Sequence, residues 1–142
     1  MENTEQKSPI VLVVDDDELA IKAVVQLLAR RGFEMLSATS GRAALDILAK
    51  KPVDVLVLDV LMPEMTGLDV CRTLRSDGRF NELPIILLTG CDDVETRAAG
   101  MKLGVSDFLC KPFAHHELIT KIENQLNVRR ISADLDSLAD QL

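Results

Sequence analysis

Residues 10–18 read Ile-Val-Leu-Val-Val-Asp-Asp-Asp-Glu, an uninterrupted apolar run followed directly by four acidic side chains. Such a run, without polar alternation, is typical of a strand buried on both faces of a parallel sheet. Similar runs recur at 55–58, 85–88 and 108–110, and a weaker one at 33–38 is interrupted by Glu34 and Ser37. The chain therefore carries four predicted buried strands and one predicted edge strand.

Segments with helical spacing of apolar residues separate these strands. The first helix is expected to start at Asp17 or Glu18 as N-cap and to end before Gly32, and the second to run from Ser40 to before Pro52. Further helices are expected over 67–74, from Asp92 or Asp93 to Gly104, and from about His115 onward. Five strand–helix units in succession predict an α/β fold in which a parallel sheet has helices on both faces.

Chemically reactive side chains follow four of the predicted strands. Asp15 and Asp16 follow the first, Asp59 follows the run at 55–58, and Thr89 and Lys111 follow the last two. The carboxyl ends of parallel strands meet at one edge, where ligands of such sheets bind. Three carboxylates form a hard oxygen site that repels itself without a cation, which suits Mg²⁺. A carboxylate can also accept a phosphoryl group, whose charge Lys111 and Thr89 are able to stabilise.

Four stretches carry a family resemblance: VLVVDDDE (11–18), VLVLDVLMPEMTG (55–67), PIILLTG (84–90) and GVSDFLCKPF (104–113). On these stretches, residues 9–127 resemble the receiver domain of two-component response regulators. The resemblance implies a flavodoxin-like (βα)5 doubly wound parallel sheet with strand order 2-1-3-4-5. It also implies a signalling phosphoprotein rather than an enzyme. The only reactions that such a protein catalyses are its own phosphorylation and its autodephosphorylation.

The resemblance assigns roles to individual residues of this chain. It implies that Asp59 is phosphorylated to 4-aspartylphosphate. The other implied roles are metal ligands for Asp15, Asp16, Asp59 and the backbone carbonyl of Leu61; phosphoryl stabilisation for Thr89 and Lys111; switching for Thr89 and Phe108; and a cis peptide bond before Pro112. Phe108 is equally well explained as a plain core residue. Gly67 is expected to supply a backbone conformation that other residues do not adopt.

The implied function is a phosphorelay switch. A phosphoryl group passes from the phosphohistidine of a sensor histidine kinase, or a phosphotransfer protein, to Asp59 in a Mg²⁺-dependent step. The face formed by the fourth helix, fifth strand and fifth helix then changes and controls a downstream effector. Two alternatives stay open: a pseudo-receiver that acts by protein contacts without phosphorylation, and, remotely, an aspartate-nucleophile phosphatase. The haloacid dehalogenase type of phosphatase has an acid where this chain has Leu61.

The end of the chain has a different pattern. Apolar residues spaced 3, 4, 3 and 4 apart form the a/d seam of a short coiled coil: Val128, Ile131, Leu135, Leu138 and Leu142. We therefore divide the chain into a flexible segment 1–8, a receiver domain 9–127 and a helical tail or linker 128–142. The tail is expected to extend the last helix and to pair with a second copy or lead to an output domain, and a frayed tail is the competing interpretation.

The composition of the chain limits the classes of protein to which it can belong. The 142 residues suit one domain, and a formal net charge of −7 without a Lys/Arg-rich run argues against direct nucleic-acid binding. The longest apolar runs are far shorter than the roughly 20 residues of a membrane span. The polar, acidic opening predicts neither a signal nor a transit peptide. Three widely spaced cysteines fit a reducing compartment, so a cytoplasmic location is expected.

Overall fold

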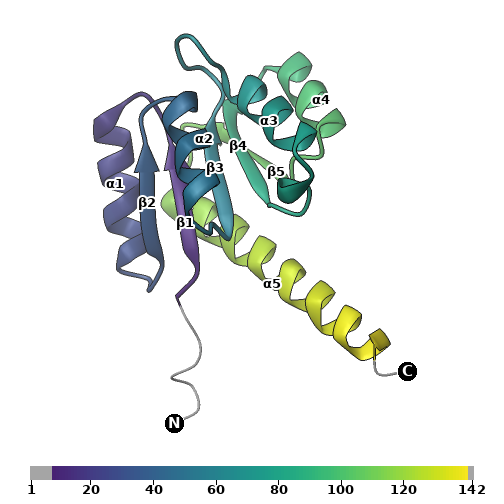
Figure 1. Cartoon of the computed structure of the whole chain (residues 1–142). Helices are drawn as coiled ribbons and strands as arrows, with labels where there is room; N and C mark the ends of the chain where they lie inside the picture. The colour runs from purple at the N-terminus through teal and green to yellow at the C-terminus, as the bar shows by residue number, and fades with distance from the viewer. Residues whose placement is uncertain (1–7, 141–142) are drawn as a thin grey trace.

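The structure, a computed structural model, describes residues 8–140, apart from the side chains of residues 130, 132, 133, 137 and 140. Within this range, strands and helices alternate along the chain (Figure 1). The elements are β1 (Ile10–Val14), α1 (Glu18–Ala29), β2 (Glu34–Ala38), α2 (Gly41–Lys50), β3 (Val55–Asp59), α3 (Gly67–Ser76), the short 3-10 helix η2 (Gly78–Phe80), β4 (Ile85–Gly90), α4 (Val94–Lys102), β5 (Asp107–Lys111) and α5 (His115–Asp140). Most of the expected flexible N-terminus, residues 1–7, and Leu142 lie outside the described residues.

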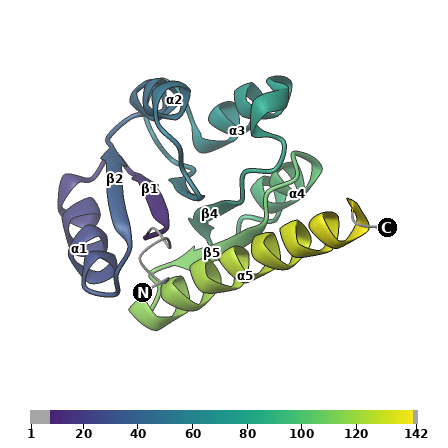
Figure 2. The ribbon, with the colours of Figure 1, turned by 60° about the horizontal axis from the view of Figure 1, so that its bottom comes forward.

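The strands of the described region form one parallel sheet in the order β2-β1-β3-β4-β5. This order confirms the predicted flavodoxin-like topology, and β2 lies at an edge as its polar interruptions predicted. Figure 2 shows the layers, with α1 and α5 on one face of the sheet and α2, α3 and α4 on the other. The core is therefore divided into two halves by the sheet.

Alternate strand residues supply the two halves of the core. Leu12 and Leu56 pack with α2 and α3, whereas Val11 and Val57 pack with α1 and α5. All residues of β3 are buried because both faces of this central strand are covered. Burial on both faces is the reason that these strands lack polar alternation.

Side-chain caps start several helices where the sequence predicted them. Asp17, not Glu18, caps α1, its carboxylate accepting from the amide of Leu19 at 3.0 Å. Asp93, not Asp92, caps α4. These bonds satisfy amides that the first turn of a helix leaves unpaired.

The last helix continues well beyond the sheet. α5 has 26 residues without a break near residue 127, and its distal part projects away from the body (Figure 1). Leu118 and Ile122 anchor its first half in the core. Arg129 holds the base of the projection, because its Nη1 donates to the carbonyl oxygen of Asp54 at 2.9 Å. None of the helices in residues 8–140 combines the length and apolarity needed to cross a lipid bilayer.

Candidate functional site

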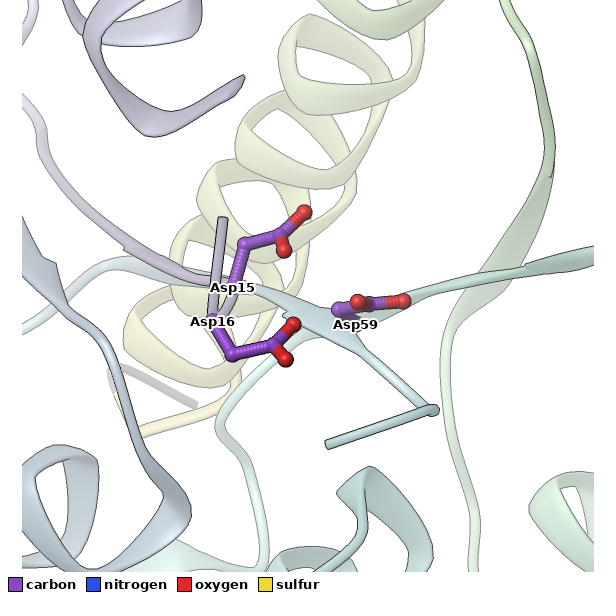
Figure 3. Close-up of side chains that lie close together, drawn as sticks. All are labelled: Asp15, Asp16 and Asp59. Carbon is purple, nitrogen blue, oxygen red and sulfur yellow. The ribbon is translucent and has the colours of Figure 1, made fainter. Parts of the chain in front are cut away.

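Three carboxylates gather at the carboxyl edge of the sheet. Asp15 and Asp16 follow β1, and Asp59 ends β3, the strand that pairs with β1. Each of the three offers an oxygen within 4.8 Å of those of the other two, and Figure 3 shows the carboxylates of Asp15 and Asp16 extending toward the side on which Asp59 lies. Strand pairing thus brings together acids that are more than forty positions apart in sequence. A compact set of oxygen ligands with this charge fits a hard divalent cation such as Mg²⁺.

A lysine from the far side of the sheet joins the acids. Lys111 ends β5, two strands away from β3, and its long side chain spans that gap. Its Nζ lies 3.1 Å from Oδ2 of Asp15 and 3.3 Å from Oδ2 of Asp59. The exposed fractions of Asp15 and Asp59 are 3% and 5%, so the carboxylates of these ion pairs are shielded from water, whereas the Lys111 side chain is 39% exposed. Burial of the carboxylates strengthens their attraction to the ammonium group of Lys111, and it also raises the desolvation cost of each charged carboxylate.

The protonation equilibrium of Asp59 reflects this environment. Burial, followed by repulsion from Asp15, raises the pKa of Asp59 to about 6, although Lys111 acts in the opposite direction. Burial lowers the pKa of Lys111, but its bonds to Asp15 and Asp59 outweigh burial, and the net shift is upward. The three carboxylates of the site carry two more negative charges than Lys111 compensates, and a bound cation would offset this excess.

A small cavity of about 100 Å³ opens beside Asp59. Its lining includes Leu61, Thr89, Asp93 and Lys111. Thr89 is buried, and its Oγ1 donates to the carbonyl oxygen of Gly90 at 3.3 Å. Asp93 was predicted from sequence only as a possible helix cap, because its position beside the cavity depends on the turn between β4 and α4. The cavity is of a size that admits a phosphoryl group next to the Asp59 carboxylate.

Leu61 and Gly67 belong to the segment that follows Asp59. The Leu61 side chain is 76% exposed, and the residue is one of those that line the cavity. The expectation that Gly67 supplies an unusual backbone conformation is wrong, because its φ is not positive. A Cβ at this position would lie 2.6 Å from the carbonyl oxygen of Asp59, so the residue is needed for close approach of two main-chain segments.

The remaining predicted residues, Phe108 and Pro112, lie on β5 and directly after it. The ring of Phe108 is half-buried, and the Arg97 guanidinium of α4 lies over it at 5.9 Å from its centroid. The peptide bond between Lys111 and Pro112 is cis. Sequence reasoning missed Arg97, since α4 has no strong apolar face to reveal which side meets β5. Its contacts join α4 to the strand that carries Phe108.

Comparison with known proteins agrees with the fold. The family model for the response regulator receiver domain matches residues 11–123. The response regulator MprA of Mycobacterium avium is 42% identical over 129 residues, which cover 91% of this chain and 56% of the relative. The MprA of Mycolicibacterium vanbaalenii is 44% identical over 124 residues, covering 87% of this chain and 52% of the relative. The chain thus spans about half the length of the curated relatives that it matches.

Solved structures agree over the whole receiver body. A response regulator from Chloroflexus aurantiacus superimposes with a TM-score of 0.80 at 35% identity, covering 85% of this chain and 99% of that one. The chemotaxis protein CheY4 of Vibrio cholerae gives a TM-score of 0.79 at 32% identity, covering 84% and 99%. Sheet order, edge cluster, family model and structural likeness all lead to one assignment. This chain belongs to the response regulator receiver domain family.

Proposed function

We propose that this chain is a phosphorylatable signalling switch whose acceptor is Asp59. The observation that carries the proposal is the position of this carboxylate, which lies 3.3 Å from Lys111, within 4.8 Å of oxygens of Asp15 and Asp16, and beside a cavity of phosphoryl size. In the transfer, an oxygen of Asp59 attacks phosphorus as the bond from phosphorus to the donor nitrogen breaks. The donor is a phosphohistidine of a sensor kinase or phosphotransfer protein.

The acidic cluster supports Mg²⁺ as the cofactor. Asp15, Asp16 and Asp59 would hold the ion together with the backbone carbonyl of Leu61. When bound, the ion neutralises charge on the phosphoryl oxygens and on the crowded carboxylates. Asp16 is exposed while Asp15 is buried, which leaves the site open on one side to water and to the incoming donor.

Two residues would stabilise the phosphorylated product. Lys111 would exchange one carboxylate contact for a phosphoryl oxygen, since its ammonium already lies 3.3 Å from Asp59. Thr89 lines the same cavity and can redirect its hydroxyl from the Gly90 carbonyl to the phosphoryl group. A charge-assisted bond to phosphate is stronger than this neutral one, which favours the redirection.

The output step is a rearrangement of the α4–β5–α5 face. Movement of Thr89 would leave space for Phe108, whose half-buried ring lies under Arg97 of α4. The local charge change would thereby bias a two-state element that a downstream effector reads. The family assignment supports kinase and effector partners, and the free cysteines of the described region support a cytoplasmic setting.

The test is phosphorylation of the purified chain with acetyl phosphate and Mg²⁺, followed by intact mass spectrometry. We expect the mass of one phosphoryl group on the native chain and on Asp46→Asn, a control on the exposed side of α2, and none on Asp59→Asn. Binding of a beryllofluoride mimic should shift amide signals of Thr89 and Lys111 by NMR. A folded chain that never gains the phosphoryl group would favour the pseudo-receiver alternative, and turnover of a phosphomonoester substrate would favour a phosphatase.

The projecting part of α5 supports a second proposal, that residues 128–142 form a tail through which two copies pair. Its described seam residues are all more than half exposed, although they are apolar and repeat at coiled-coil spacing: Val128, Ile131, Leu135 and Leu138. Over the receiver body, residues 9–127, the same helix buries its apolar residues instead. Water-exposed apolar residues at this spacing fit a partner helix of the same pattern.

Sedimentation velocity across a concentration series tests this pairing on the full chain. A dimer should form in the native chain and be lost in the double variant Ile131→Glu, Leu135→Glu. Leu19→Glu, which introduces the same charge at a 78% exposed position of α1, should leave the dimer intact. A native chain that stays monomeric throughout the series would contradict pairing and favour an output domain or a frayed tail.

A further inference from the structure

A pair of cysteines lies beside the phosphorylation site and has no part in the proposed transfer. The pairing of β4 with β5 sets Thr89 opposite Cys110, and Gly90 opposite Lys111. Cys91 follows Gly90 directly, where the chain leaves the sheet. Both cysteines therefore lie at the carboxyl edge of the sheet, next in sequence to residues that line the cavity beside Asp59.

The side chains of the two cysteines interact. The pKa of Cys91 is raised, first of all by its hydrogen bond with the Cys110 thiol. Cys91 is exposed and Cys110 is half-buried, so small reagents from solution reach this pair. Cys71 is different, because it lies on the buried face of α3 and burial raises its pKa to about 11. The chain thus contains two adjacent accessible thiols and one inaccessible thiol that serves as an internal control.

Arg97 supplies a positive charge to the pair. Its Nη2 donates to Sγ of Cys110 at 2.8 Å, and its charge also acts on Cys91. Among the described residues, no carboxylate forms an ion pair with Arg97, and its buried Nε has no hydrogen-bond partner. The charge of Arg97 works against the rise in the pKa of Cys91, although the net shift stays upward, so adjacency and access to solution distinguish this pair of thiols.

We propose that Cys91 and Cys110 form a redox-sensitive pair that a peroxide converts into an intrachain disulfide. One thiolate attacks a peroxide oxygen, so an S–O bond forms, the O–O bond breaks and hydroxide leaves. The other thiol then attacks the resulting sulfenic sulfur, so the S–S bond forms, the S–O bond breaks and water leaves. The two thiols together lose two electrons and two protons, and the peroxide is reduced to two waters.

The disulfide would act directly on the switch. The segment that it closes, from Cys91 to Cys110, contains the whole of α4. It would also tie the turn after Thr89 to the strand end that carries Lys111, the two residues that we assign to the phosphoryl group. The oxidised chain would therefore accept phosphate more slowly and hold α4 in one position. This consequence, unlike the disulfide itself, rests on the proposed function.

Peptide mapping tests the disulfide independently of phosphorylation. Trypsin places the two cysteines in separate peptides, residues 80–97 and 103–121, because the bond between Lys111 and Pro112 resists cleavage. After mild treatment with hydrogen peroxide and alkylation under denaturing conditions, we expect these peptides to be linked and Cys71 to carry the alkyl group. Cys91→Ser and Cys110→Ser should each abolish the link. Disulfides between separate chains, or both thiols recovered free, would overturn the proposal.

Acetyl phosphate labelling of reduced and oxidised protein tests the consequence. We expect oxidation to slow the labelling of Asp59 by at least about tenfold. Reduction of the oxidised protein with dithiothreitol should restore the original labelling rate. Each Ser variant is compared with itself before and after peroxide, and neither should respond. A linked chain that is labelled at the reduced rate would overturn the regulatory role. A reduced chain that is never labelled would instead refute the proposed function and leave the disulfide result standing.

Discussion

Asp59 experiences opposing influences at the scale of a single residue. Burial and Asp15 favour its protonated form, whereas Lys111 favours the carboxylate. The carboxylate is the nucleophile of the proposed transfer. The folded chain therefore already bears part of the free-energy cost of an ionised, desolvated nucleophile before any donor binds. A cation bound by the neighbouring acids reduces that cost, which links metal binding to acceptor reactivity.

The raised pKa makes the stability of the chain depend on pH in a definite direction. Because the folded state has a pKa of about 6 and ordinary aspartate 3.8, the folded chain binds the Asp59 proton more tightly than the unfolded chain. The resulting stabilisation is fully present below about pH 4 and is lost as pH rises through 6. Asp59→Asn should therefore raise the free energy of unfolding at pH 7 by on the order of 1 kcal/mol in the absence of Mg²⁺.

Urea unfolding of metal-free protein at pH 4 and pH 7 checks this prediction. The advantage of Asp59→Asn should shrink at pH 4, where the native side chain is itself protonated. Asp46→Asn, on the exposed side of α2, should change stability by less than about 0.5 kcal/mol at either pH. An advantage of equal size at both pH values would show that ionisation of Asp59 is not its source.

Gly67 carries a second prediction at this scale. Gly67→Ala should destabilise the chain by about 1–3 kcal/mol, because the added Cβ meets the main chain of Asp59 and Val60 rather than a flexible side chain. It should also disturb the acceptor, since the carbonyl that moves belongs to Asp59. Gly78→Ala is the matched control, because its Cβ would meet nothing within 4 Å. Thermal unfolding should separate the two variants; equal midpoints would contradict the close-approach argument.

At the scale of elements, one arginine joins α3 to the end of α4. The Arg75 guanidinium donates to main-chain carbonyls of Leu103 at 2.9 Å and Gly104 at 2.8 Å, which lie just beyond α4. It also donates to the carbonyls of Phe80 and Leu83 in the connection to β4. The C-terminal end of α4 is thus fastened to the body, while its N-terminal end, capped by Asp93, lies at the cavity beside Asp59.

Arg75→Met should lower the free energy of unfolding by roughly 2–3 kcal/mol, because carbonyls that accept from a charged donor lose their partner. Arg72→Met is the matched control on the same helix. Arg72 pairs with Asp69 at a surface where both side chains are about half exposed, and such a pair contributes less than about 1 kcal/mol. Urea unfolding of both variants measures the difference, and a smaller loss for Arg75 than for Arg72 would refute the fastening role.

At the scale of the whole molecule, the net charge of −7 is partly concentrated at one edge of the sheet. A ligand that binds the folded state alone stabilises it by mass action, by about 2.7 kcal/mol at a hundred times its dissociation constant. Mg²⁺ should therefore raise the thermal midpoint of the chain. The unfolded chain lacks the convergence of Asp15, Asp16 and Asp59, so it offers no comparable site.

Differential scanning calorimetry with Mg²⁺ and with EDTA checks this effect. Asp15→Asn should largely remove the Mg²⁺-dependent shift, whereas Asp46→Asn should retain it. An equal shift in both variants would indicate a nonspecific ionic effect instead of a site at this edge.

Local patterns in the sequence were sufficient for much of the architecture. The uninterrupted apolar runs predicted the buried strands, because strands covered on both faces need no polar side, and capping residues such as Ser40 marked helix starts. The motif stretches predicted which acids, hydroxyl and lysine belong together. The inferences about strands and helix starts succeeded because each depends on neighbours a few positions away in the chain, whereas the grouping of the acids, hydroxyl and lysine came from the resemblance of whole motif stretches.

What the sequence by itself determined is the succession of strands and helices and the reactive residues at the strand ends. Only the tertiary structure showed that the oxygens of Asp15, Asp16 and Asp59 converge, that Gly67 serves close approach, and that Arg97 lies over Phe108 and against Cys110. The reason is physical: pairing across the sheet and packing of α4 on β5 join residues distant in sequence, and no local periodicity encodes those contacts.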